Sequence, residues 1–159
     1  MKKMICMFFL ILYLTNLSAC SNKTKMATAN FYYLDNMPHY HTNETVIQPE
    51  SRELSITLTE TETIIREYLD GPNTKQLTSP FPSGTKLISI QPGKEMTEIV
   101  LSDEIAQLSG IDLTVACACL SATILEISQS ESVHIRAETA NIGPQGYVIM
   151  DQQSIPFLG

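Results

Sequence analysis

The chain has 159 residues, which suits one ordinary domain and leaves little room for two. Apolar residues make up 43% and charged residues 17%, a composition typical of a globular chain and not of a disordered or collagen-like one. The formal net charge of −7 argues against nucleic acid as a partner, because phosphate binding needs clustered cations. With 4 Cys, the chain also lacks the dense disulfide framework of small secreted domains.

The N-terminus has the pattern of a secretory signal. Lys2 and Lys3 precede an apolar run over 5–14, which is shorter than the roughly 20 residues that a spanning helix needs. The following tetrad, Leu17-Ser18-Ala19-Cys20, resembles the lipobox of bacterial lipoproteins. This resemblance implies cleavage before Cys20 and acylation of that cysteine, which would anchor the mature chain in a membrane. An ordinary secretory signal cut nearby is the alternative.

These boundaries predict the domain organisation. We expect a lipoprotein signal peptide over 1–19, an acylated N-terminus and flexible tether over 20–28, and one folded domain over 29–159. Removal of the signal takes away two lysines and no acids, so the mature chain would carry a charge of −9.

The first half of the domain is predicted to contain two strands and a helix. Strands are expected over 31–34 and 45–48, with the second ending before Pro49. A helix should begin at a capping box of Thr59 and Glu62 and end at Gly71. The apolar residues of this helix recur at helical spacing and form one stripe: Ile64, Ile65, Tyr68 and Leu69.

The second half is predicted to contain four more strands and two helices. Strands over 86–91 and 97–101 flank Pro92-Gly93, which suits the centre of a type II turn. Ser102 should cap a short helix that ends at Gly110, and Asp112 a longer helix to about Ser128. The long helix is apolar on nearly all sides, which predicts burial, and we expect it to be too short to span a bilayer. Strands over 133–137 and 147–150 complete the domain.

The resulting order is β-β-α-β-β-α-β plus a short terminal strand. It predicts the α+β class, with a small, mostly antiparallel sheet and two main helices on one face.

Several sequence blocks resemble the GerM domain, a module of sporulation and germination proteins and of related envelope lipoproteins. The blocks occur in order between Phe31 and Ala137: Tyr32-Tyr33-Leu34, Pro49-Glu50-Ser51-Arg52-Glu53-Leu54, Tyr68-Leu69-Asp70-Gly71-Pro72, the stretch 77–87, and Val100-Leu101-Ser102. The resemblance implies a helix-strand-strand-helix-strand core similar to the ring-building domains of envelope secretion machines. It also implies a non-catalytic, extracytoplasmic module that binds partners or assembles at a membrane surface, with sporulation as the setting.

The candidate chemistry in the folded part is weak. His39 and His41 offer two ligands where a metal site needs three or four, so we expect a solvated loop. Cys117 and Cys119 diverge on a helix, which favours core packing over redox chemistry. The motif Gly-x-Ser-x-Gly and a glycine-rich phosphate loop are both missing from the sequence, and His134 is interpreted as a polar-face residue.

Two further patterns have ordinary structural interpretations. Glu60, Glu62, Glu67 and Asp70 follow the exposed side of the first helix. The proline-rich loop over 77–85 is expected to stiffen a crossover, with Phe81 turned inward, although such a loop could also present a contact surface.

We therefore predict a non-enzymatic, lipid-anchored assembly or protein-interaction module at the extracytoplasmic face of the cell membrane, with no cofactor, no metal and no catalytic residue. Its expected partners are the membrane, through the lipid on Cys20, and envelope or sporulation-complex proteins. Self-association should be weak and confined to the membrane, because acidic domains repel one another at contact distance. A solute- or ligand-sensing lipoprotein and an accessory tether of a cell-wall hydrolase are the alternatives.

Overall fold

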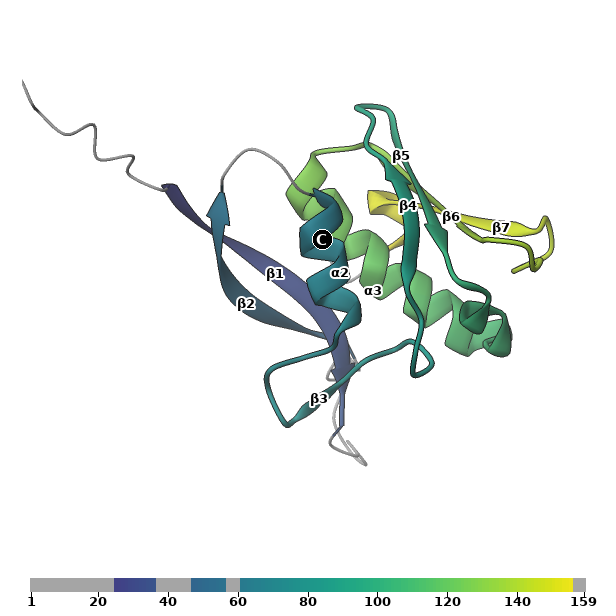
Figure 1. The fold of residues 1–159 in the computed structure, drawn as a ribbon, viewed down its shortest axis with the longest axis horizontal. Coiled ribbons are helices and arrows are strands. Elements are labelled where there is room, and N and C mark those ends of the chain that lie inside the picture. Colours follow the sequence, from purple (N-terminus) through teal and green to yellow (C-terminus); the bar gives the residue numbers. More distant parts are fainter. Residues whose placement is uncertain (1–24, 37–46, 57–60, 156–159) are drawn as a thin grey trace, which may run out of the picture.

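The computed structural model describes residues 25–36, 47–56 and 61–155. Two sheets enclose the helices (Figure 1). The first sheet has the order β2-β1-β3 and consists of β1 (Lys25–Asp35), β2 (Ile47–Ile56) and β3 (Leu77–Thr78). The second has the order β4-β5-β6-β7 and consists of β4 (Leu87–Gln91), β5 (Met96–Leu101), β6 (Ser132–Ala137) and β7 (Tyr147–Asp151).

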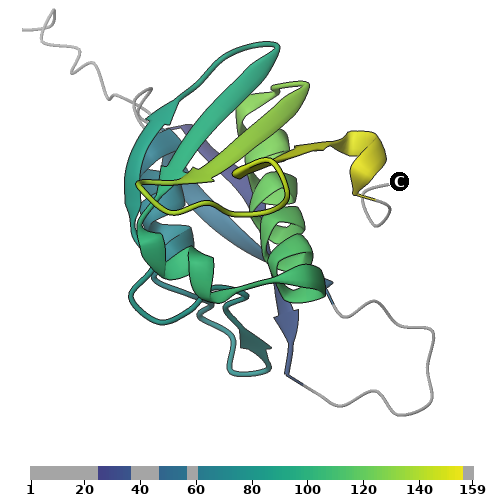
Figure 2. The same ribbon diagram turned by 90° about the vertical axis from the view of Figure 1, so that its right-hand side faces the viewer.

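The helices form the middle layer of the domain. They are α2 (Thr61–Leu69) and α3 (Gly110–Ser128), with two short 3-10 helices, η1 (Asp103–Gln107) and η2 (Gln152–Ser154). Figure 2 shows α3 running along the length of the domain, beside the strands.

The α+β class is confirmed, and the predicted order of elements matches apart from the added short strand β3, which lies in the segment predicted as a loop. The strands divide between two sheets instead of forming one. The reason lies in α3, whose residues Ala116 to Leu125 are all buried. A helix that is apolar on all sides must be covered on more than one side, and here β1 covers one side while β6 and β7 cover another. The crossover through α3 also makes β5 and β6 parallel, whereas the other paired strands are antiparallel.

The expectation that this helix is too short to span a bilayer needs correction. Among the described residues, α3 is the one helix long and apolar enough to cross a membrane by length and composition, with 19 residues. However, 61% of its most apolar window is buried inside the domain. Its apolar character is therefore explained by its place between the two sheets.

The hairpin of β1 and β2 is longer than predicted at both ends. The strand β2 continues through Pro49 to Ile56, because β2 is an edge strand and an edge tolerates the missing N–H of proline. The strand β1 begins at Lys25, whose backbone pairs with that of Ile56. The last four residues of the segment 20–28, treated above as tether, therefore belong to this strand.

Helix α3 also covers the free edge of β1. The N–H of Tyr32 donates to Thr123 Oγ1 at 3.0 Å, and the N–H of Asn30 donates to Glu126 Oε1 at 3.2 Å. Without these contacts the two N–H groups would be free to pair with a further strand, because β3 pairs only with Leu34 and Asp35 at the other end of β1. The contacts also show that α3 and β1 run in opposite directions.

The turn predicted at Pro92-Gly93 differs from the structure. Gly93 lacks the positive φ that a type II turn requires. Its importance is steric, because a Cβ at this position would lie 2.3 Å from the carbonyl oxygen of Met96. Ser130 Oγ supports the same loop by donating to the Gly93 carbonyl oxygen at 2.6 Å.

Some of the predicted helix caps also differ from the structure. Gly110 begins α3 with a φ of 54° instead of ending the preceding short helix, so Ser109 takes the N-cap position and Asp112 lies in the first turn. Ser102 precedes η1 as predicted, but its hydroxyl accepts a hydrogen bond from the N–H of Lys86. Gly71 follows α2 with a φ of 104°, as expected for a C′ glycine. The predicted cap at Thr59 lies outside the described residues.

Candidate functional site

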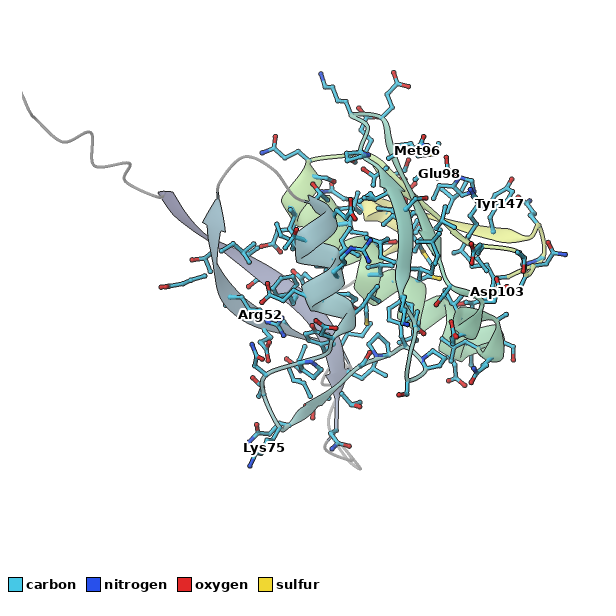
Figure 3. All side chains as sticks on the ribbon, in the orientation of Figure 1. Arg52, Lys75, Met96, Glu98, Asp103 and Tyr147 are labelled. Carbon is cyan, nitrogen blue, oxygen red and sulfur yellow. The ribbon has the colours of Figure 1, made fainter. Side chains whose placement is uncertain are left out.

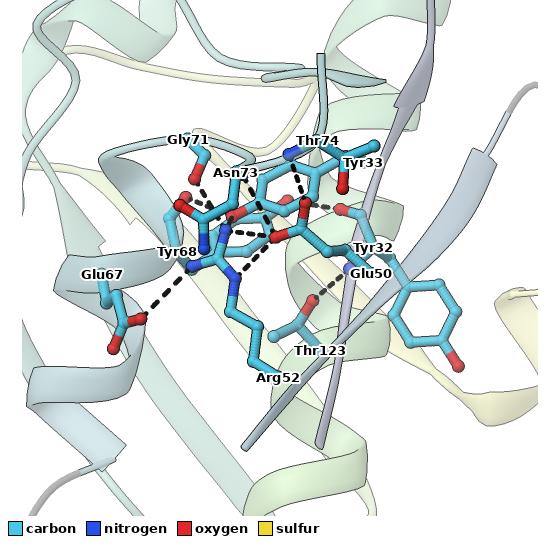
Figure 4. Close-up of polar contacts among 10 residues, drawn as sticks. All are labelled: Tyr32, Tyr33, Glu50, Arg52, Glu67, Tyr68, Gly71, Asn73, Thr74 and Thr123. Carbon is cyan, nitrogen blue, oxygen red and sulfur yellow. Dashed lines mark hydrogen bonds and ion pairs between the residues drawn. The ribbon is translucent and has the colours of Figure 1, made fainter. Parts of the chain in front are cut away.

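A buried ion pair joins the β1–β2 hairpin to the segment that follows α2 (Figure 4). The guanidinium of Arg52 lies 2.6 Å from Glu50 Oε1, and the two side chains are only 7% and 8% exposed. Arg52 Nη2 also donates to the carbonyl oxygen of Gly71 at 2.8 Å and to the hydroxyl of Tyr33 at 3.3 Å. The guanidinium carbon lies 4.5 Å from the centroid of the Phe31 ring, within the range of a cation–π contact.

Glu50 completes this cluster by holding the loop after α2. Its two carboxylate oxygens accept the backbone N–H groups of Asn73, at 3.2 Å, and Thr74, at 2.8 Å. Burial would raise the pKa of Glu50, but the hydrogen bonds from Thr74, Arg52 and the Asn73 backbone lower it below its ordinary value. The carboxylate is therefore ionised at neutral pH.

These contacts give the cluster a structural role. Burial raises the pKa of the Tyr33 phenol, whose hydroxyl donates to the Tyr68 carbonyl oxygen at 2.9 Å. Each ionic or phenolic group of the cluster thus has a partner. The cluster lies where the blocks 49–54 and 68–72 meet, so the sequence blocks that carry the family resemblance contact one another in space. Sequence reasoning missed this contact, although the alternation of Glu50, Arg52 and Leu54 places them on one side of a strand.

The two cysteines of the domain have the structural role that the sequence predicts. Cys117 and Cys119 are free thiols, both fully buried in α3. Burial raises the pKa of each thiol to about 12, so both stay protonated and unreactive at neutral pH. The proline-rich loop also packs inward, because Phe81 is buried and lies edge-on to the Tyr68 ring at a centroid distance of 6.2 Å.

The solvent-facing side of β4–β7, hereafter the outer face, carries exposed apolar side chains. Ile88, Met96 and Ile149 are 41%, 42% and 52% exposed. The charges on this face are paired, since Arg136 Nε donates to Glu98 Oε1 at 2.9 Å. His134 lies here as predicted, edge-on to the Tyr147 ring at 4.6 Å. Figure 3 shows Met96, Glu98 and Tyr147 along this sheet.

A groove adjoins the outer face where α3 begins. Its volume is about 840 Å³, and none of its lining residues is charged. Ile111 projects beside it with 80% of its surface exposed, more than any other large apolar residue described. We call this feature the distal groove and define it by its lining residues: Ala106, Leu108, Ser109, Gly110, Ile111, Leu113, Thr114, Val115, Asn141, Ile142, Gly143, Pro144, Tyr147 and Val148. Tyr147 belongs to both the groove and the outer face, so the two surfaces are continuous.

The segments that line the distal groove are acidic. Over 103–115 and 137–148 the chain carries four acids and no lysine or arginine: Asp103, Glu104, Asp112 and Glu138. Hydrogen bonds from the Thr139 hydroxyl and from the N–H groups of Thr139 and Ala140 lower the pKa of Asp103, which keeps that carboxylate charged. The lining of the groove is therefore uncharged, and the segments that supply it carry four acids, which we call the acidic margin. Sequence reasoning missed it because its lining comes from segments about 30 residues apart, although the long stretch without cations was visible.

The other predicted site residues divide into two groups. Cys20, His39 and His41 lie outside the described residues. Glu62, Glu67 and Asp70 are exposed on and just after α2, as expected for a solvated helix face. In the part of the chain that the structure describes, no three of the side chains of His, Cys, Asp and Glu are grouped to hold a metal ion.

Comparison with known proteins gives one family match. The family model described as "Germane: Sporulation and spore germination" matches residues 30–142. No curated protein sequence matches the chain.

Solved structures with a similar fold include two from Bacillus subtilis. The tandem GerMN domains of the sporulation protein GerM align with 87% of this chain and 49% of that one, at 16% identity and a TM-score of 0.59. The first GerMN domain of GerM aligns with 71% of this chain and 84% of that one, at 15% identity and a TM-score of 0.52. A Clostridium perfringens protein described as a candidate lipoprotein aligns with 83% of this chain and 91% of that one, at 22% identity and a TM-score of 0.47.

Proposed function

Because the chain belongs to the Germane family of sporulation and spore germination proteins, we propose that it is a lipid-anchored, non-catalytic module that binds another protein at the extracytoplasmic face of the cell membrane. The family and the GerM-like fold support the sporulation or germination setting. The lipobox-like tetrad ending at Cys20 supports the anchor.

One observation carries the interaction role. On a chain with a net charge of −7, the distal groove and the outer face form a continuous surface with exposed apolar side chains, and the lining of the groove carries no charge. Exposed apolar surface of this kind is typical of protein–protein contact sites. The Arg52 cluster and the thiols, which hold the strongest candidates for chemistry among the described residues, are enclosed and fully occupied by structural contacts.

The solute-sensing alternative has less support from the geometry. A small-molecule site is normally concave and encloses most of its ligand, with a few converging polar groups. Of the polar residues that line the distal groove, Ser109, Thr114 and Asn141 are exposed and Tyr147 is half-buried. The groove therefore suits part of a protein surface better than an enclosed solute.

The anchor is tested by growing cells with a labelled fatty acid. We expect label on the wild-type chain and its loss in Cys20→Ala, with the variant moving out of the membrane fraction. An unlabelled wild-type chain would refute the anchor. The interaction role is tested in the same cells with a photo-crosslinking residue at Ile149, and at exposed Lys75 in the loop after α2 as the control. Crosslinks to one protein from Ile149 alone are expected during sporulation or germination, and equal or absent crosslinking would refute the role.

A further inference from the structure

We propose that the distal groove binds a basic, amphipathic segment of another protein, with the apolar residues of that segment in the groove and its lysines or arginines at the acidic margin. This inference rests on the proposed interaction function and names the partner's chemistry. It places contact at the α3 end of the molecule, away from the membrane anchor.

The chemistry of the groove selects for an apolar contact. None of its lining residues is charged. Leu108, Ile111 and Val115 supply aliphatic side chains at the start of α3. Ile111 is 80% exposed on the first turn of a helix whose residues 116–125 are all buried. Covering such a side chain is favourable, because it removes apolar surface from water.

The margin of the groove selects for positive charge. Asp103, Glu104, Asp112 and Glu138 come from the segments that form the groove, and these segments hold no cation of their own. Asp112 is exposed in the same helical turn as Ile111. An acidic or neutral partner would lose this attraction, and complementary charge both steers encounter and selects among partners.

The position of the groove argues against the membrane as its occupant. The contact of Asn30 with Glu126 lies five residues from the start of β1, or about 17 Å at the rise of a strand. Because α3 runs opposite to β1, Ile111 lies about 22 Å farther along, at 1.5 Å per residue over 15 residues. An anchor at Cys20 would reach Lys25 over at most about 17 Å of extended chain, so the groove lies far from the bilayer end of the domain.

A second copy of the chain is also a poor occupant of the groove. A second copy would bring a net charge of the same sign to an acidic margin.

The test uses the full lipidated chain in nanodiscs of phosphatidylcholine, with empty nanodiscs as the blank. The probes are three fluorescent 12-residue peptides: one of Leu and Lys in an amphipathic helical pattern, one with Glu in place of Lys, and one with Ser in place of Leu. We expect saturable binding of the first peptide only, weakened by added salt because Asp112 and Glu138 are exposed.

Two variants locate the contact. Ile111→Ser should weaken binding of the Leu/Lys peptide about tenfold, and Asp112→Asn should weaken it by a smaller factor and reduce its salt dependence. The control is Gln76→Ser, at an exposed neutral residue of the loop after α2, which should bind as the wild type does. Thermal unfolding should be unchanged in all three variants because these side chains are exposed.

Several results would overturn the inference. These are equal binding by Ile111→Ser and wild type, binding of the Glu peptide, and a dimer that Ile111→Ser abolishes, which would assign the groove to a second copy. An Ile111→Trp chain whose fluorescence shifts to the blue in nanodiscs compared with detergent would assign the groove to lipid. Each result leaves the label on Cys20 and the Ile149 crosslink intact, so failure here is distinguishable from failure of the proposed function.

Discussion

The substitution Arg52→Met removes the cation from the buried cluster while keeping a long side chain in its place. Removing one partner of a buried ion pair typically costs about 3–5 kcal/mol of the free energy of unfolding, because the other charge is left without compensation. Here Glu50 keeps the N–H groups of Asn73 and Thr74, so we expect the lower end of that range, about 3 kcal/mol. The loss includes the hydrogen bond to the Gly71 carbonyl oxygen and the cation–π contact with Phe31.

The assay is urea unfolding at pH 7, followed by circular dichroism, on the mature chain from Ser21. The matched control is Arg136→Met, whose ion pair with Glu98 has side chains 42% and 30% exposed, and which should cost less than about 1 kcal/mol. The double variant Glu50→Leu with Arg52→Met should not recover stability, because two loop N–H groups would lose their acceptor at about 1–3 kcal/mol each. A cost below about 1 kcal/mol for Arg52→Met, or recovery in the double variant, would refute this reasoning.

Two other predictions concern titratable groups of the core. Because hydrogen bonds lower the pKa of Glu50 in the folded state, its contribution to stability is complete above its ordinary pKa near 4.5 and is lost as pH falls through the lower folded value. We therefore expect the free energy of unfolding, measured with urea between about pH 6 and pH 3, to fall less with decreasing pH in Glu50→Gln than in the wild type. The same pH dependence in both chains would contradict this prediction. Since the pKa values of Cys117 and Cys119 are raised to about 12, Ellman's reagent should label them only after unfolding, and rapid labelling of the folded chain would argue against core packing. Replacing either by Ala should cost about 1 kcal/mol.

Local sequence patterns predicted most of the secondary structure correctly, and the errors have physical causes. The alternation of Val133, Ile135 and Ala137 predicts β6 because burial on one face of a strand requires it. The prediction that the second strand ends before Pro49 was wrong. A proline fits in an edge strand, and whether a strand lies at an edge depends on the order of strands in the sheet, which the local sequence does not indicate. The all-round apolar character of α3 predicted burial but did not indicate that a second sheet would supply part of the cover.

The surfaces were harder to predict than the elements. Glu50 and Gly71 come together only once α2 packs beside the hairpin, and the distal groove forms from segments on either side of α3. Neither arrangement has a short-range sequence signal. By contrast, the buried role of Cys117 follows from helical geometry and apolar neighbours, so that prediction was confirmed.

The side chains that α3 places along β1 have a consequence for crowded conditions. An uncovered strand edge can recruit a strand from a neighbouring molecule, and molecules tethered to one surface meet often. Here an incoming strand would have to displace Thr123 and Glu126 from the N–H groups of Tyr32 and Asn30. Glu126 also accepts from the side-chain amide of Asn30 and the hydroxyl of Tyr32, so one carboxylate holds the edge at three points. The helix thus blocks the addition of a further strand along this edge of β1. Copies anchored side by side on one membrane would then not polymerise by strand pairing at this edge.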